Sequence, residues 1–223
     1  NHGEHFIAYF QSFTNTYADL DTLRNLFLPA ISEPSVVGLS VATRPDCLPQ
    51  NVIELINELN QIKPVFIELG LQTIHEKTAQ FIRRGYELKT YDEAVSSLQK
   101  TGVHIITHMI LGLPGETKEM MMQTAKHIGN VGSHGIKLQL LHILKGTDLA
   151  TFYEGSGFNT LSETEYIDAL CECVLSLPNG TVLHRITGDA PKSLLVAPMW
   201  SADKKRILQK IKDEFSHRNI ILT

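Results

Sequence analysis

Cysteine is scarce in this chain. Only three of its 223 residues are cysteine, Cys47, Cys171 and Cys173, which is too few for a disulfide framework. A reducing, cytoplasmic setting is therefore the expectation. Cys47 is isolated, while Cys171 and Cys173 lie two residues apart in a segment of helical periodicity. Their side chains would diverge on a helix, so we expect both to pack in the core.

Long apolar runs and a strong charge of one sign are also missing. No apolar run is long enough to span a bilayer, and the chain begins with no signal-peptide pattern, so no membrane association is expected. The net charge of -4 gives no overall basic surface. A nucleic-acid partner would therefore need a local basic patch or another domain.

Short apolar runs alternate with segments of helical periodicity, and the hydrophobic fraction of 43% is enough for a sizeable core. The expected strands are 6–10, 36–42, 65–69, 104–111, 136–143 and 181–186. The expected helices are 20–31, 49–61, 76–84, 90–101, 117–131 and 163–177, with a charged surface helix at about 202–216. This alternation predicts a parallel α/β sheet with right-handed crossovers, as a single domain over residues 1–223.

Unusual polar or glycine-rich chemistry marks the ends of five of these strands. The segments are 11–17, 43–46, 68–72, 112–117 and 142–147. Carboxyl ends of parallel strands converge on one mouth in a closed or partial barrel, and ligands bind there. The five segments therefore predict an active-site rim. The turn from Gly112 to Gly115 leaves backbone at this mouth with no side chains in the way.

Motifs along nearly the whole chain resemble the radical SAM superfamily, most closely the YhcC/YtqA-type branch related to the Elongator catalytic subunit. The motifs are Tyr9–Ala18, Gly38–Ser40, Thr43–Cys47, Glu68–Gln72, Arg84–Gly85, Ile110–Thr117, Lys145–Thr147 and His184–Pro191. The resemblance implies a partial (β/α)6 TIM-like barrel of parallel strands whose N-terminal first strand is missing from this chain. It also implies the S-adenosylmethionine (SAM) binding core of an iron–sulfur oxidoreductase.

The resemblance assigns cofactor-binding roles to several residues. Gln72 would hydrogen-bond the SAM ribose, and Arg84, in the following helix, would pair with the SAM carboxylate. A guanidinium suits that bidentate task better than an ammonium. The turn formed by Gly112 and Gly115 would lie against adenine, with apolar walls from Ile110 and Leu113.

Two departures from the family pattern change the pocket. The Gly-Gly-Glu-like stretch that contacts the SAM amino group is replaced by Gln11-Ser12-Phe13, so Ser12 or Thr14 is expected to make this contact. Elongator-like relatives often carry Glu just before the Thr-Arg-Pro-Asp element, where this chain has Ala42. That change removes one carboxylate.

The remaining polar residues of these motifs are expected on the substrate side of the mouth. They are Arg44, Glu68, His108, His142, Lys145, His184 and Arg185. Kinship with Elongator-type enzymes suggests a tRNA wobble uridine as substrate, and Arg44, Lys145 and Arg185 could meet its phosphate or base.

The chain contains no C-x3-C-x2-C triplet, which in the family holds the 4Fe-4S cluster that binds SAM. The family places this triplet upstream of the strand at 6–10. We therefore expect no cluster and no metal site in this chain, and no activity from it alone. The full-length parent, fed by an electron donor, would generate a 5'-deoxyadenosyl radical that abstracts a substrate hydrogen. Without the first strand, the edge at 6–10 could pair with a second copy.

Two other classes stay open from the residues alone. A cluster-independent α/β-barrel enzyme would use Glu68, His108 and His142 for acid–base chemistry and would bring these three side chains together. A non-catalytic RNA- or nucleotide-binding module would show RNA affinity with a steep salt dependence.

Overall fold

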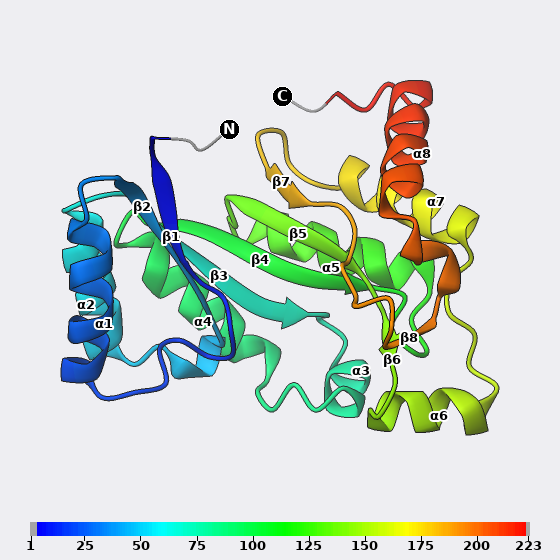
Figure 1. Cartoon of the computed structure of the whole chain (residues 1–223), viewed down its shortest axis with the longest axis horizontal. Coiled ribbons are helices and arrows are strands. Elements are labelled where there is room, and N and C mark those ends of the chain that lie inside the picture. The colour runs from blue at the N-terminus through cyan, green and yellow to red at the C-terminus, as the bar shows by residue number, and fades with distance from the viewer. Residues whose placement is uncertain (1–3, 222–223) are drawn as a thin grey trace.

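Six parallel strands form one curled sheet in the computed structural model, which describes residues 4–221. The strands are β1 Phe6–Phe10, β2 Val36–Thr43, β3 Val65–Gln72, β4 His104–Leu111, β5 Gly135–Leu140 and β7 Val182–Arg185. Their order in the sheet is the order of the chain, β1-β2-β3-β4-β5-β7, and each neighbouring pair is parallel. The expected partial barrel of parallel strands is confirmed (Figure 1).

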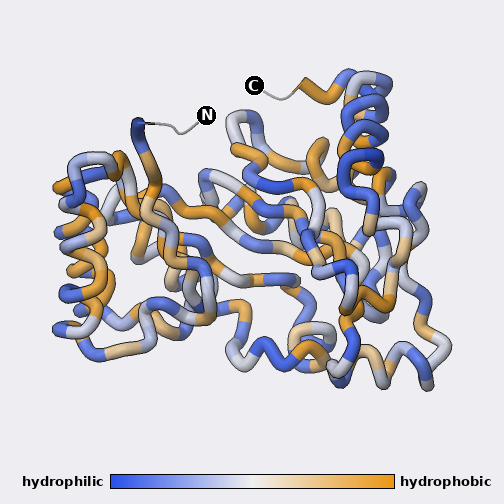
Figure 2. The backbone as a smooth tube through the Cα atoms, viewed as in Figure 1, coloured by the Kyte–Doolittle hydropathy of each residue, from blue (hydrophilic) through white to orange (hydrophobic). Residues whose placement is uncertain are grey.

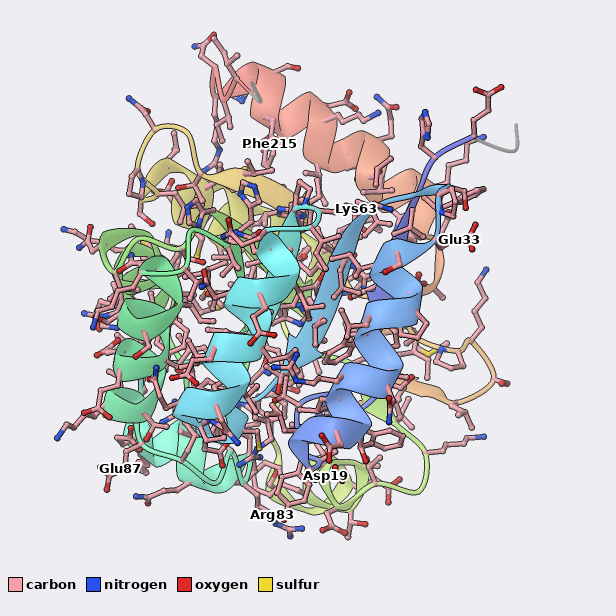
Figure 3. All side chains as sticks on the ribbon, turned by 90° about the vertical axis from the view of Figure 1, so that its left-hand side faces the viewer. Asp19, Glu33, Lys63, Arg83, Glu87 and Phe215 are labelled. Atoms are coloured by element: carbon pink, nitrogen blue, oxygen red, sulfur yellow. The ribbon has the colours of Figure 1, made fainter. Side chains whose placement is uncertain are left out.

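Helices connect the strands and cover the convex side of the sheet. They are α1 Leu20–Ser32, α2 Gln50–Asn60, α3 Glu76–Phe81, α4 Leu88–Gln99, α5 Lys118–Asn130 and α7 Glu163–Leu175. Figure 3 shows α1, α2 and α4 side by side in front of the sheet. Asp19 and Arg83, which follow strands, lie at one end of the molecule, and Glu33 and Lys63, which precede strands, lie at the other. All strands therefore end at the same face, as the crossover rule requires.

Alternation along the strands separates two chemically different faces. On the convex face, Leu69, Met109 and Leu138 are fully buried against the helices. Each such side chain contributes about 1.5–3 kcal/mol of transfer free energy. On the concave face, the intervening positions include Ser40, Glu68 and Lys137. Successive side chains of a strand point to opposite faces, so this period of two builds an apolar core on one side and a polar hollow on the other.

The end of the chain adds a second, small layer. Helix α6 spans Asp148–Ser156, and β6 Ile143–Leu144 pairs antiparallel with β8 Leu195–Ala197. Two 3-10 turns cover Pro45–Cys47 and Met199–Ala202. Helix α8, Lys204–His217, is mostly hydrophilic (Figure 2) but buries Ile207, Ile211 and Phe215 against the core. The expected charged helix that packs one side onto the barrel is confirmed.

Two expected boundaries are wrong, for local reasons. The expected strand 136–143 breaks after Leu140, because Leu141 N donates to Leu111 O and the chain then leaves the sheet to form β6. The expected helix 76–84 ends at Phe81, because Arg83 takes a positive φ of 56° and Arg84 N donates back to Ala79 O. Arg84 therefore lies in a loop and not in a helix.

Two observations bear on partners of the fold. Strand β1 is an edge of the sheet, and Phe6 and Ile7 are about half exposed on it. Dimerisation through this edge stays a prediction. Across residues 4–221, no helix is long and apolar enough to cross a membrane.

Candidate functional site

A polar cavity of about 410 Å³ opens on the concave face of the sheet, at the carboxyl ends of the strands. Six residues expected from the sequence line it: Arg44, Glu68, Gln72, Arg84, His108 and Arg185. Gln11, Phe13 and Gly70, from motifs quoted above, also line it, as do Tyr86, Lys137 and Gln139, which the sequence analysis did not single out. The expected convergence of strand ends on one mouth is therefore confirmed for the segments 11–17, 43–46 and 68–72, which follow or end β1, β2 and β3. The segments 112–117 and 142–147 do not line this cavity, which β4, β5 and β7 reach through His108, Lys137, Gln139 and Arg185.

Glu68 is the centre of a hydrogen-bonded cluster on the cavity floor. Its Oε2 accepts from the Tyr9 hydroxyl at 2.8 Å, from His108 Nε2 at 2.7 Å and from Lys137 Nζ at 2.5 Å. Its Oε1 accepts from Ser40 Oγ at 3.1 Å. We call Tyr9, Ser40, Glu68, His108 and Lys137 the floor cluster. One residue comes from each of β1 to β5, so five strands must be in register for it to form.

Burial and hydrogen bonding have opposite effects on the pKa of Glu68. Burial of this side chain, which is 4% exposed, raises its pKa, but the hydrogen bonds from His108, Lys137 and Tyr9 outweigh burial and hold the pKa at about 2. Glu68 is therefore a carboxylate at neutral pH. Burial and the hydrogen bond to Glu68 raise the pKa of Tyr9 above its usual range, so Tyr9 stays protonated and donates.

Gln72 ends β3 in an unusual conformation at the cavity mouth. Its φ is +71°, a left-handed value that costs a non-glycine residue of order 1–3 kcal/mol and is concentrated at functional sites. The register between β3 and β4 shifts between Gly70 and Gln72. A Cβ at Gly70 would lie 3.0 Å from Gln72 Nε2, so glycine there leaves room for the amide. The hydroxyl of Tyr86 donates to Gly70 O and fixes this backbone.

Arg84 is buried beneath the mouth and is already engaged. Its guanidinium donates to Thr73 O at 2.6 Å, to Tyr86 O at 2.9 Å and to Glu76 Oε1 at 2.9 Å, and its side chain is 2% exposed. The ring of Tyr86 lies between this guanidinium and that of Arg44, with centroid distances of 4.7 and 5.4 Å. Arg84 is therefore a buried, hydrogen-bonded cation and not an exposed surface charge.

The glycine turn lies beside the cavity and does not line it. Gly112 and Gly115 have φ of 84° and 82°, and a Cβ at Gly112 would lie 3.1 Å from the side chain of Leu161. Leu113 is buried, and Ile110 is partly buried. Thr73 Oγ1 donates to Glu116 Oε1 at 2.5 Å, which ties the turn to the segment that follows Gln72.

The other expected site residues lie away from the cavity lining. Ser12 and Thr14 belong to the β1–α1 loop beside Phe13. His142 shares a hydrogen bond of 3.1 Å with Ser201 Oγ, and burial lowers its pKa. The acid–base triad of the alternative enzyme is therefore reduced to the Glu68–His108 pair.

Two further expected residues, Lys145 and His184, do not line the cavity either. Lys145 opens the turn into α6, where Thr147 Oγ1 accepts from Ala150 N and caps the helix. His184 is on β7, and burial lowers its pKa, with Lys137 as the next cause. Motif membership alone therefore did not predict which side chains meet in the hollow.

Lys137, Gln139, Tyr9 and Ser40 were missed, although the sequence carries a sign of the first two. Strands of a parallel sheet covered on both faces read as continuous apolar runs. Here β5 reads Gly-Ile-Lys-Leu-Gln-Leu, with a polar side chain at every second position. That period indicates a strand with one polar face. In β1 (Phe-Ile-Ala-Tyr-Phe) and β2 (Val-Val-Gly-Leu-Ser-Val-Ala-Thr) no such alternation is present, so the same test does not find Tyr9 or Ser40.

The cysteines do not gather into a metal site. Cys171 and Cys173 on α7 are fully buried, and burial raises their pKa values to about 11 and 12. The expectation that they pack in the core is confirmed. Within residues 4–221, no group of three or more His, Cys, Asp or Glu side chains is arranged to hold a metal ion.

Comparison with protein families matches both parts of the chain. Residues 2–128 match the Radical SAM superfamily, and residues 133–217 match the Radical_SAM C-terminal domain.

Three relatives extend this match. The chain is 44% identical to the YtqA protein of Bacillus subtilis over 213 residues, which cover 96% of this chain and 66% of that protein. It is 36% identical to the YhcC protein of Escherichia coli K12 over 205 residues, covering 92% of this chain and 66% of that one. It is also 25% identical over 168 residues to the tRNA uridine(34) acetyltransferase of Methanocaldococcus jannaschii, covering 74% of this chain and 30% of that one.

Among solved structures, the archaeal Elp3 of Methanocaldococcus infernus superposes with a TM-score of 0.83 at 17% identity, covering 98% of this chain and 55% of that one. At this identity the likeness shows a shared fold. The chain spans about two thirds of YtqA and YhcC, and about half of the Elp3 structure.

Proposed function

The chain belongs to the radical SAM superfamily, and from this we propose that its concave cavity binds SAM at the mouth and the substrate above the floor cluster. Gln72 is the observation that carries the proposal. Its backbone is strained at the carboxyl end of a central strand, and Gly70, two residues earlier, leaves room for its amide. Strained backbone of this kind is concentrated at ligand-binding and active sites.

The residues around the mouth fit the polar groups of SAM. The amide of Gln72 offers a donor and an acceptor, which suits two neighbouring ribose hydroxyls. A guanidinium has five N–H donors, and three of those of Arg84 are used within the protein. One N–H on each terminal nitrogen remains, and we propose that these two meet the SAM carboxylate. Ser12 or Thr14 would receive the amino group.

The glycine turn lies beside the cavity, and we propose that the adenine of SAM extends past the cavity to reach it. Its backbone from Gly112 to Gly115 is anchored from below by Leu113 and from the side by the contact of Glu116 with Thr73. We propose that this rigid turn and Ile110 form the adenine wall. With an electron from the iron–sulfur cluster of the family, bound SAM would supply the hydrogen-abstracting chemistry.

The described residues do not fit the iron–sulfur cluster that the family uses. Two of the three cysteines are buried in the core on α7, and Cys47 stands apart from them, so they do not offer three convergent thiolates. We propose that this chain by itself does not hold the cluster.

For the substrate we propose a uridine of tRNA. The support is the tRNA uridine(34) acetyltransferase among the relatives, together with a local set of cations in an otherwise acidic chain. Arg44, Arg83 and Arg84 pair with Asp46, Asp148 and Glu76 at the cavity. Arg185 lines the same cavity and, within the part of the chain described, has no carboxylate within ion-pair distance. Arg185 would therefore meet an anionic group of the substrate.

The test of SAM binding is calorimetric titration of the chain with SAM, compared with Gln72→Ala and with Gln123→Ala, an exposed glutamine on α5. Loss of the hydrogen bonds of Gln72 removes about 1–2 kcal/mol, or roughly five- to thirtyfold in affinity. Gln123→Ala is expected to bind SAM like the unaltered chain. Equal affinity of both variants would exclude Gln72 from the site.

A further inference from the structure

The two ring nitrogens of His108, in the floor cluster, face different surroundings. Nε2 lies 2.7 Å from Glu68 Oε2, while Nδ1 lies 3.4 Å from Gln139 Nε2 on the cavity wall. The side chain is 17% exposed, so one edge of the ring reaches the cavity.

The charge of Glu68 fixes which nitrogen carries the proton. A carboxylate only accepts hydrogen bonds, and Glu68 is ionised because its pKa is about 2. His108 Nε2 must therefore be the protonated nitrogen, which leaves a lone pair on Nδ1. The lone pair is the basic site of the ring, and it faces the wall where a substrate would lie.

The carboxylate of Glu68 has other hydrogen-bond donors in the floor cluster besides His108. Ser40, Tyr9 and Lys137 already supply three donors to Glu68. Lys137 and Tyr9 contact the carboxylate and each other, with Lys137 Nζ donating to the Tyr9 oxygen at 3.0 Å. The arrangement of a buried carboxylate, an oriented imidazole and a second ring nitrogen whose hydrogen bond, to Gln139, is long at 3.4 Å is one that enzymes use for proton transfer, with the substrate taking the place of the amide at Nδ1.

Gln139 can serve both protonation states of the ring. Its amide nitrogen now donates to the lone pair of Nδ1. Half a turn of the amide would present its oxygen to a protonated Nδ1, because the two ends of a glutamine amide are a donor and an acceptor of similar shape. The ring can therefore gain and lose a proton at Nδ1 without leaving a polar atom unpaired.

We propose that His108 exchanges a proton with the bound substrate through Nδ1, with Glu68 as the positioning residue. The substrate class is a molecule that presents a dissociable N–H or O–H, such as a base imide, to the cavity floor. The proton passes from that atom to Nδ1, the electron pair of the broken bond stays on the substrate, and the imidazolium formed is stabilised by Glu68. The reverse transfer restores both partners. The location of the substrate rests on the proposed function, whereas the protonation chemistry of His108 does not.

The groups that face His108 come from each strand packed around it. They are Tyr9 of β1, Glu68 of β3, Lys137 of β5, and His184 and Arg185 of β7. Of these, His184 is the other imidazole, and burial lowers its pKa, so its response must be separated from that of His108.

The first test is nitrogen-15 NMR of the histidine rings of the chain between pH 5 and 9, with His108→Gln and His184→Gln to assign the signals. We expect His108 to show a protonated Nε2 and a bare Nδ1 at high pH, and to gain a proton at Nδ1 as the pH falls. Glu68→Gln should produce a mixture of the two tautomers. A ring protonated at Nδ1 at high pH, or one that never titrates in this range, would overturn the proposal.

The second test uses the full-length, cluster-loaded protein with unfractionated tRNA as the probe, measuring 5'-deoxyadenosine and the change in tRNA nucleosides. We expect His108→Gln to keep formation of 5'-deoxyadenosine within about threefold but to slow the nucleoside change about a hundredfold or more. His104→Gln, four residues earlier on β4 and stacked on Phe66, is the matched control and should retain both. An unchanged rate and pH profile in His108→Gln would refute proton transfer. No nucleoside change in the unaltered protein would refute the tRNA proposal instead, and the NMR result would still decide the role of His108.

Discussion

The ionised state of Glu68 makes a quantitative prediction about acid stability. Its pKa is about 2 in the folded chain, against an ordinary value of 4.5. A carboxyl group with a depressed folded pKa adds stability that is present above pH 4.5 and is lost as the pH falls toward 2. The gap corresponds to roughly 3 kcal/mol, because one pKa unit is about 1.4 kcal/mol. By pH 3, about 2 kcal/mol of this should be gone.

The assay is urea unfolding followed by circular dichroism at pH 6, 5, 4 and 3, for the unaltered chain and for Glu68→Gln. Other carboxyl groups titrate in both proteins and cancel in the difference between their unfolding free energies. Glu68→Gln should be less stable at pH 6, because it leaves Lys137 buried without its carboxylate. The difference between the two proteins should shrink by about 2 kcal/mol between pH 6 and pH 3. A difference that stays constant across this range would refute the argument that the floor cluster holds Glu68 ionised.

Two further predictions concern packing around the site. Lys137→Met should lower the unfolding free energy by about 3–5 kcal/mol, because it leaves Glu68 as a buried charge without its cation. The control Lys126→Met, on the exposed side of α5, should change the unfolding free energy by less than about 0.5 kcal/mol. Equal effects of the two in urea unfolding would contradict the buried pair. Gly112→Ala should cost about 1–3 kcal/mol in thermal or urea unfolding, because its φ is positive and its Cβ would crowd Leu161. The control Gly155→Ala in α6, where a Cβ would meet open space, should be neutral or slightly stabilising. A loss of unfolding free energy at Gly155 as large as at Gly112 would contradict the claim that the conformation of the turn requires glycine.

Most of the sheet could be predicted from the sequence because each of its strands is a short apolar run that can be recognised locally. The run at 104–111 coincides with β4, and 6–10 coincides with β1. The small layer could not be predicted in this way. Strand β6 has two residues, and its partner β8 lies about fifty positions later, so its existence depends on a distant pairing. Helix α6 follows a Gly-Thr turn whose capping role is visible only with the helix in place.

The site was predictable in its location and only partly in its members. The polar and glycine-rich segments at the strand ends predicted where the mouth lies, and six of the expected residues line the cavity. In the floor cluster, Tyr9 contacts Glu68 across 59 positions of the sequence and Lys137 contacts it across 69. Neither contact can be predicted from the local sequence pattern around these residues. The polar alternation in β5 indicates that Lys137 faces a hollow, but its partner is defined by the register of the whole sheet. His142 shows the opposite case, since the break after Leu140 turns it away from the hollow.

Backbone NMR of the labelled chain during titration with SAM tests the central claim most directly. The account predicts saturable shifts at Gln72 and Arg84, which line the cavity, and at the adjacent turn from Gly112 to Gly115, with α8 unaffected. In Gln72→Ala the same shifts should need roughly five- to thirtyfold more SAM to saturate. Shifts that map to another surface, or none at the mouth at saturating SAM, would contradict the claim that this cavity holds SAM.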